Sequence, residues 1–214
     1  WPIRAVDAPA GVDSVAVLGG WSGFGAAILD VSNKSAPLVK YQFSEFNSEE
    51  VFATTIGGRQ YAFVASPSAS TEGQPGLYVF DMTSALALPS YCREDLLTPQ
   101  CGGGVFKGRI EPGSVQYVAG LDNYIVVSHG TITGIQIYDA SNVASCSGGT
   151  CTAVQLKLSA LNDKQVYGVA LWKQGSTYYL AVRLVTAAFP VLQELRIYDV
   201  SCITGTCASM PPPV

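Results

Sequence analysis

Four copies of one short motif constrain the fold of this chain more strongly than any other feature of its sequence. Each copy is an apolar run with the residue preferences of a strand, followed by Asp, a small or apolar residue, and then Ser or Thr. Successive motif Asp residues lie about 50 to 60 residues apart, a period that indicates one structural unit built four times. The copies occupy residues 27–32, 78–83, 136–141 and 196–201.

The four carboxylates of the motif favour a structural interpretation. A carboxylate at a strand end accepts hydrogen bonds from backbone N–H groups two residues ahead, and the following hydroxyl can do the same. Such a pair closes a strand and reverses the chain. The alternative, that these carboxylates are catalytic groups or metal ligands, is less consistent with their presence in every repeat. The residues concerned are Asp30, Asp81, Asp139 and Asp199.

Three further strands accompany the motif in a full unit. In the second unit, residues 50–55 form a β-rich run, a turn at Gly57 and Gly58 follows, and residues 61–66 form the next run. No segment shows sustained helical periodicity, so each unit is predicted to hold four short antiparallel strands. The other expected strands are 2–6, 38–43, 76–81, 105–110, 115–119, 124–128, 134–139, 153–158, 165–172, 177–182 and 194–199.

Stacking of such units predicts a β-propeller. A sheet that is apolar on both faces cannot shield itself, so neighbouring sheets must cover it. We therefore expect an all-β chain of about four four-stranded antiparallel blades, as part of a larger propeller. The start at Trp1 and the terminal Pro run predict a removed leader or a piece of a longer protein. The expected blades are residues 1–45, 46–112, 113–160 and 161–210, with 211–214 as the start of a Pro-rich linker.

The motif resembles the LVIVD-type repeat of bacterial propellers, in which an apolar run, Asp, an apolar residue and Ser end the third strand. The resemblance covers all four copies, from about residue 14 to residue 202. Only the first copy soon reaches the Pro that the family usually shows, at Pro37, and the spacing is longer than is usual for the family. The resemblance implies a propeller fold and frequent cell-surface or secreted use. It implies no catalytic residues.

Composition excludes several classes of function. Apolar residues make up 48% of the chain and charged residues 13%, which is the reverse of a disordered chain. A formal net charge of -4 gives no electrostatic support for binding nucleic acid. The sequence holds no apolar stretch of membrane-spanning length, so we expect no transmembrane segment in this chain.

The six cysteines fall into three close pairs, each after the motif Asp of units two to four. This repeated position predicts three disulfides between sequence neighbours, which would fix loops and place the protein outside the cell, on its surface or in the periplasm. The competing interpretation is structural zinc, which needs four ligands combined in one site and finds no His near these pairs. The predicted pairs are Cys92 with Cys101, Cys146 with Cys151, and Cys202 with Cys207.

Antiparallel strand order separates two faces of the predicted propeller. The turns between strands 1 and 2 share one face with the cysteine loops, and the loops between strands 2 and 3 share the other with the connections between blades. Loops on a rigid scaffold often carry function, so we expect binding residues on the second face. The alternative is that their apolar side chains pack between blades. The candidates are Trp21, Phe24, His129 and Phe189, with Leu192 beside them.

Paired carboxylates at the start of a predicted inner strand raise a second possibility. Glu49 and Glu50 could serve acid–base chemistry or bind calcium near the propeller axis. The positions expected to be equivalent, namely Ser114 and Gln116 in blade three and Lys164 and Gln165 in blade four, are not acidic, so a ring of converging acids is not expected in this part. His129, the sole His, follows Ser128 directly, and neighbouring strand residues point to opposite faces, which argues against a catalytic triad.

These observations favour a non-enzymatic binding module of an exported or cell-surface protein, with no cofactor and a protein or surface glycan as its ligand. The alternative is part of a propeller hydrolase or lyase, whose channel site is completed by blades outside this chain. A third possibility is a structural spacer within a large surface protein. Titratable groups that meet at the axis would favour the enzyme.

Overall fold

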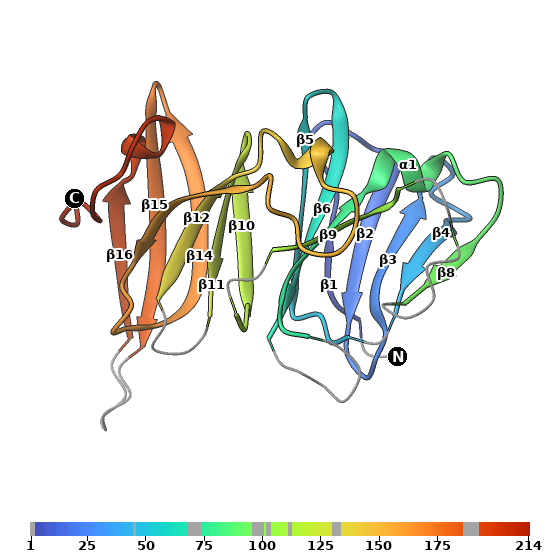
Figure 1. Cartoon of the computed structure of the whole chain (residues 1–214), viewed down its shortest axis with the longest axis horizontal. Helices are drawn as coiled ribbons and strands as arrows, with labels where there is room; N and C mark the ends of the chain where they lie inside the picture. The colour runs from blue at the N-terminus through green and yellow to red at the C-terminus, as the bar shows by residue number, and fades with distance from the viewer. Residues whose placement is uncertain are drawn as a thin grey trace.

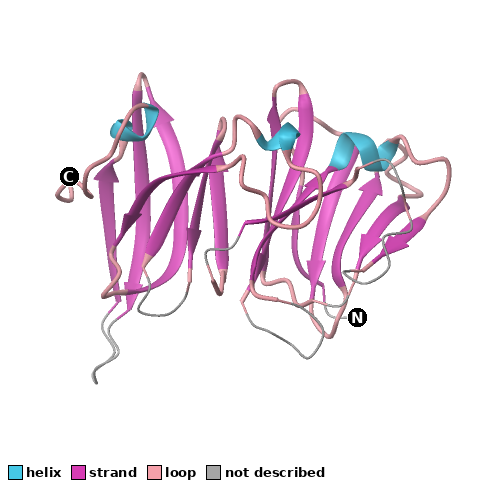
Figure 2. Ribbon diagram, viewed as in Figure 1, coloured by secondary structure: helices cyan, strands magenta, loops and turns pink. Residues whose placement is uncertain are grey.

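The chain forms four antiparallel sheets in succession along the sequence, as a computed structural model shows. In Figure 1 the first two sheets form the right half of the molecule and the last two form the left half. The strands of all four run between the same two ends of the molecule. In the part of the chain that the structure describes, helix is confined to three short segments at one end (Figure 2). The structure describes residues 3–44, 46–67, 74–95, 101, 104–110, 113–129, 134–185 and 193–214.

The order of strands within each sheet is the order of the sequence. Blade 1 runs β1 (Ile3–Asp7), β2 (Val15–Gly20), β3 (Gly25–Asp30) and β4 (Leu38–Phe43). Blade 2 runs β5 (Glu50–Ile56), β6 (Arg59–Ser66), β7 (Gly76–Asp81) and β9 (Phe106–Ile110). Blade 3 runs β10 (Tyr117–Leu121), β11 (Tyr124–Ser128), β12 (Ile135–Asp139) and β13 (Gln155–Ala160). Blade 4 runs β14 (Gln165–Gln174), β15 (Thr177–Val185) and β16 (Gln193–Asp199).

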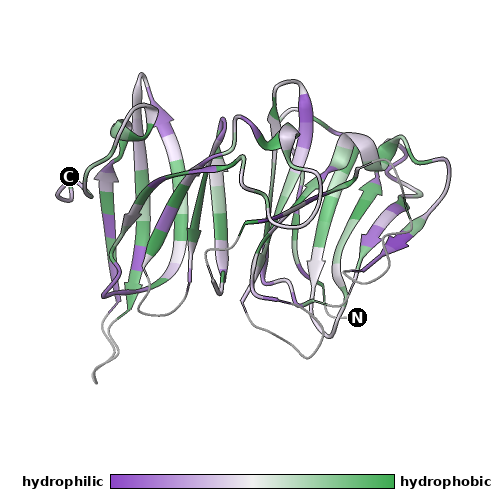
Figure 3. Cartoon of the chain, in the orientation of Figure 1, coloured by the Kyte–Doolittle hydropathy of each residue, from purple (hydrophilic) through white to green (hydrophobic). Residues whose placement is uncertain are grey.

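Three apolar clusters hold consecutive blades together. Side chains alternate across each strand, so a middle blade contributes to both neighbours. In β6, for example, Ala62 and Val64 pack toward blade 1, whereas Tyr61 and Phe63 pack toward blade 3. Apolar segments therefore follow the strands of every sheet (Figure 3). Successive sheets that cover each other in this way are the blades of a β-propeller, and the predicted fold is confirmed.

The first and last blades each keep one face outside these clusters. The side chain of Val6 in β1 is 66% exposed, and that of Leu195 in β16 is 69% exposed. Blade 1 also holds a fifth strand, β8 (Cys92–Glu94), which pairs with β4 in parallel. Blade 4 has three full strands among the described residues, so the prediction of four equal sheets holds for two blades and is modified at both ends.

The motif carboxylates close their strands as turn formers. Asp30 Oδ1 accepts hydrogen bonds from the N–H and hydroxyl of Ser32, and these bonds lower the pKa of Asp30. Asp139 and Asp199 accept the N–H of the Ser two residues ahead. Asp81 instead caps α1 (Met82–Leu86) through the N–H of Ser84 and pairs with Arg59 at 2.6 Å.

A glycine begins the third strand of blades 1 and 2 and immediately precedes that of blade 3, because the fourth strand passes very close to it. A Cβ on Gly25 would lie 2.1 Å from the carbonyl oxygen of Phe43, and one on Gly134 would lie 2.2 Å from that of Ala160. Gly76 faces the carbonyl of Ile110 in the same way. In blade 4 this position, five residues before the motif Asp, holds Glu194.

The C-terminal segment lies against the open side of blade 4. Pro213 forms an antiparallel bridge with Tyr198, and the Val214 N–H donates to the Ile197 carbonyl at 3.0 Å. Tyr138, the residue before the motif Asp in blade 3, pairs with the fourth strand at the corresponding place. Pro213 therefore occupies the register of a fourth strand in blade 4.

The three disulfides join sequence neighbours, namely Cys92 with Cys101, Cys146 with Cys151, and Cys202 with Cys207. The middle pair is buried, and the other two are half-buried. The short helices η1 (Val143–Ser145) and η2 (Ser201–Thr204) lead into the second and third of these loops.

Candidate functional site

Two tyrosines from the inner strands of blades 3 and 4 contact each other where those strands begin, on the face that carries the strand 2–3 loops. We call this end the loop face; it is the lower end in Figure 1. Tyr117 of β10 lies within electrostatic reach of charged groups from blades 2 and 4. We define the loop-face cluster as Glu49, Glu50, Tyr117, Tyr167 and Arg183.

Two tyrosines form the centre of this cluster. The ring centroids of Tyr117 and Tyr167 are 6.4 Å apart, with an angle of 56° between the ring planes. Burial raises the pKa of Tyr117, and the charges of Glu49 and Glu50 raise it further. Both rings are half-buried, so each offers an apolar surface and a hydroxyl.

Glu50 links blade 2 to blade 3. Its Oε2 accepts the N–H of Val118 at 2.8 Å. Burial raises the pKa of Glu50, the hydrogen bond from Val118 opposes this shift, and the charge of Asp7 adds to it. Asp7 makes the corresponding link between blades 1 and 2 by accepting the N–H of Ala53 at 2.7 Å. The carboxylates near the axis thus act partly as ties between inner strands.

Arg183 supplies the positive charge of the cluster from β15. Its side chain is exposed, and its Nε and Nη2 donate to Gln193 Oε1 at 3.2 and 2.8 Å. A planar guanidinium and a planar amide held together present several donors and acceptors in a fixed arrangement. The cluster and Gln193 together therefore combine aromatic surface, both charge signs and an amide.

His129 is buried, with only 2% of its area exposed. Its Nδ1 lies 2.5 Å from the carbonyl oxygen of Ser114, which can only accept, so Nδ1 carries the proton. Burial lowers the pKa of His129, while its contacts with Ser114 and Gln136 oppose that shift. The ring is a buried neutral group that joins the start of blade 3 to its third strand.

Trp21 and Phe24 lie in the strand 2–3 turn of blade 1. The guanidinium of Arg4 lies 4.7 Å from the centre of the Trp21 ring, and both aromatic side chains are half-buried. Within the described residues, no ring contact or hydrogen bond joins either side chain to the loop-face cluster. Phe189 and Leu192 lie outside the described residues.

Strand register explains why the sequence missed Tyr117 and Tyr167. Glu50 pairs with Ala65, and Ala65 pairs with Leu77. Tyr117 pairs with Ser128, and Ser128 pairs with Ile135. Leu77 and Ile135 stand at the same distance before their motif Asp, so Tyr117 is the residue equivalent to Glu50. Ser114 and Gln116, which the sequence suggested as equivalents of Glu50, are therefore out of register with it. Counting back from the motif Asp through the paired residues gives Tyr117 as the equivalent.

The described part of the chain shows neither a group of metal ligands nor a helix that could span a membrane. There, no group of three or more His, Cys, Asp or Glu is placed to hold a metal ion, including around Glu49 and Glu50, where calcium was considered. None of the described helices is long and apolar enough to cross a membrane.

Comparisons with known proteins give structural neighbours only. No protein-family model matches the chain, and no curated protein matches it. The resemblance to the LVIVD-type repeat therefore stays a prediction.

Three solved structures illustrate the likeness in fold. An alpha-L-arabinanase mutant from Cellvibrio cellulosa has a TM-score of 0.46 and 13% identity, over 94% of this chain and 70% of that one. A xylan beta-1,4-xylosidase from Bacillus halodurans C-125 has a TM-score of 0.44 and 12% identity, over 92% and 41%. An endo-arabinase from Bacteroides thetaiotaomicron VPI-5482 has a TM-score of 0.39 and 11% identity, over 94% and 76%. At these values the comparison carries no argument about activity, and the fold rests on the sheets of the chain itself.

Proposed function

We propose that this chain is the ligand-binding part of an exported β-propeller and that its loop face takes a carbohydrate. The observation that carries the proposal is the pair of half-buried rings, Tyr117 and Tyr167, beside Glu49 and Arg183. Sugar rings have apolar faces that lie against aromatic rings, and hydroxyls that pair with charged or amide side chains. The loop-face cluster offers both kinds of partner within one site.

Export is supported by the cysteines. All six are in disulfides, and disulfides persist in oxidising compartments. A surface or secreted glycan is a ligand that such a protein would meet. The LVIVD-type resemblance supports the same location.

The test is calorimetric titration with a panel of soluble oligosaccharides that includes arabinan and xylan fragments. We expect at least one member to bind, and Tyr167→Ala to weaken it about tenfold, since an aromatic platform residue of this kind contributes roughly 1–3 kcal/mol. The matched control is Tyr179→Ala, which removes a tyrosine from the outer face of blade 4, where the ring stacks on Trp172. Equal weakening by both variants, or no binding to any glycan, would contradict the proposal.

A second candidate function is glycoside hydrolysis at the same site. The raised pKa of Glu50 favours it, because a general acid must keep its proton near neutral pH. Release of new reducing ends from a bound oligosaccharide, abolished by Glu50→Gln, would identify the enzyme. Binding without release of reducing ends would reject hydrolysis and support the binding module.

A further inference from the structure

The connection between the third and fourth strands of blade 2 leaves its own blade and lines the outer edge of blade 1. Its strand β8 pairs in parallel with β4, and the N–H of Ser44 donates to the carbonyl of Glu94 at 3.0 Å. Side chains strengthen the contact in both directions. Lys40 Nζ donates to the Leu88 carbonyl at 2.6 Å, and the Tyr91 hydroxyl donates to Gln42 Oε1 at 3.0 Å.

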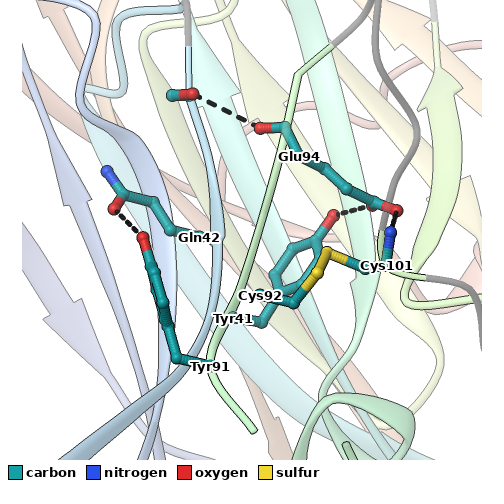
Figure 4. The surroundings of a disulfide bond; sticks show 7 residues. Tyr41, Gln42, Tyr91, Cys92, Glu94 and Cys101 are labelled. Carbon is teal, nitrogen blue, oxygen red and sulfur yellow. Dashed lines mark hydrogen bonds between the residues drawn. A yellow bond between two sulfur atoms is a disulfide. The ribbon is translucent and has the colours of Figure 1, made fainter.

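A buried carboxylate lies at the centre of this contact (Figure 4). Glu94 is only 8% exposed. Its Oε2 accepts the hydroxyl of Tyr41 at 2.5 Å, and its Oε1 accepts the N–H of Cys101 at 2.9 Å. Burial raises the pKa of Tyr41 most, and the hydrogen bond to the Glu94 carboxylate raises it further. A buried carboxylate depends on such partners, because an unpaired one is costly.

The disulfide between Cys92 and Cys101 controls one of those two partners. Cys92 is in β8 itself, and Cys101 supplies the N–H that binds Glu94. The covalent bond therefore keeps Cys101 beside the carboxylate. Without it, the packing of Cys101 against the apolar cluster between blades 1 and 2 is what remains to hold that N–H in place.

The loop of the next blade makes a similar contact but differs in accessibility. The Arg109 N–H donates to the Gly149 carbonyl at 2.7 Å, and the Cys151 N–H donates to the Arg109 carbonyl at 2.9 Å, so this loop lines the outer strand of blade 2. Cys146 and Cys151 are 5% and 4% exposed and belong to the cluster between blades 2 and 3. Cys92 and Cys101 are half-buried, so a reductant reaches them more easily.

We propose that the Cys92–Cys101 disulfide is a redox-sensitive clasp that fastens the outer edge of blade 1 to blade 2. A dithiol reductant supplies two electrons and two protons: the S–S bond breaks, two thiols form, and the dithiol becomes a disulfide. Cys101 then leaves Glu94, the carboxylate takes up water, and β8 separates from β4. The four blades stay folded, because many buried side chains fill the apolar clusters between them, and Cys101 is only one of the partly buried residues that pack against one cluster.

Amide hydrogen exchange tests the clasp, with Ser44 as the reporter because its N–H binds the Glu94 carbonyl directly. The full chain is treated with mild dithiothreitol, and mass spectrometry confirms which disulfides have opened. We expect Cys92–Cys101 to open before Cys146–Cys151, and exchange at Ser44 to rise roughly tenfold. Exchange in β11 of blade 3 should not change.

Two paired variants separate the clasp from general loosening. Cys92→Ser with Cys101→Ser should reproduce the faster exchange at Ser44 without reductant. Cys202→Ser with Cys207→Ser removes a disulfide from blade 4 and should leave Ser44 protected. Unchanged protection at Ser44 after the bond is opened would overturn the proposal, and so would an equal rise of exchange in β11.

Discussion

Blades 1 and 2 are joined by aromatic rings and an edge clasp, whereas blades 3 and 4 are joined mostly by aliphatic side chains. Phe43 alone makes ring contacts with Phe46, Tyr78, Phe80 and Phe106. The cluster between blades 3 and 4 is instead rich in Val, Leu and Ile, with one tyrosine contact between Tyr124 and Tyr178. One blade architecture thus tolerates two ways of filling the same interface, and stability should differ along the chain.

The ties near the axis differ in the same direction. Carboxylates from one inner strand accept an N–H of the next between blades 1 and 2 and between blades 2 and 3. Between blades 3 and 4, the contacts at this level are the ring pair of Tyr117 and Tyr167 and the hydrogen bond from the Ser128 hydroxyl to the Val166 carbonyl, with no carboxylate among them in the described residues. The repeat therefore determines the strands, whereas the side chains that join neighbouring inner strands differ from one pair of blades to the next.

The largest expected effect comes from truncating the aromatic interface. Phe43→Ala should lower the free energy of unfolding by about 4 kcal/mol, because it removes a buried ring with four aromatic neighbours. Leu180→Ala, at a fully buried aliphatic position between blades 3 and 4, should cost about 3 kcal/mol. Denaturant unfolding measures both. A larger cost for Leu180→Ala would break the comparison.

A second effect concerns the glycine at the start of the third strand, where the fourth strand passes closest to it. Gly25→Ala should cost about 3 kcal/mol, since φ at Gly25 is +69° and the added Cβ would collide with the Phe43 carbonyl. Glu194→Ala changes the equivalent position of blade 4, where a side chain is already accommodated, and should leave the melting temperature unchanged. A similar loss in both variants would show that the third strands are not distinguished by the neighbouring carbonyl.

The smallest effect is a change in pH dependence. The folded-state pKa of Glu50 is raised, so the folded protein binds this proton more tightly than the unfolded chain does. Its contribution to stability is therefore present at low pH and is lost as pH rises from the ordinary Glu value through the raised one. Glu50→Gln should flatten the unfolding free energy across that window, while Gln165→Asn, at the start of the inner strand of blade 4, should leave it unchanged. A steeper decline in Glu50→Gln would contradict the assignment.

Local sequence signals predicted the elements well but not all of their partners. The motif strands, the turn-forming Asp residues and the sequential disulfides followed from short-range chemistry. The path of residues 87–94 could not be predicted in this way, because β8 pairs with β4 of another blade and has no signal of its own beyond three residues. Glu94 of β8 and its partner Tyr41 in β4 are 53 positions apart in the chain.

The candidate site shows the same division. Glu49 and Glu50 were found because two adjacent acids are visible in any sequence. Tyr117 and Tyr167 were missed because their importance depends on register, and a shift of one residue turns a side chain to the other face of the sheet. The five-residue spacing from Gly25, Gly76 and Gly134 to the motif Asp was visible in the sequence, but its meaning required the nearby carbonyls.

By itself, the sequence determined the repeat, the β-strands, the reversal after each motif Asp and the pairing of neighbouring cysteines. Each of these depends on residues close together in the chain, whose propensities and hydrogen bonds act locally. Tertiary structure decided which residues meet across blades: the aromatic interface, the carboxylate ties, the buried position of His129 and the clasp around Glu94. Those contacts depend on register and on the stacking of sheets, which bring together groups that no local pattern connects.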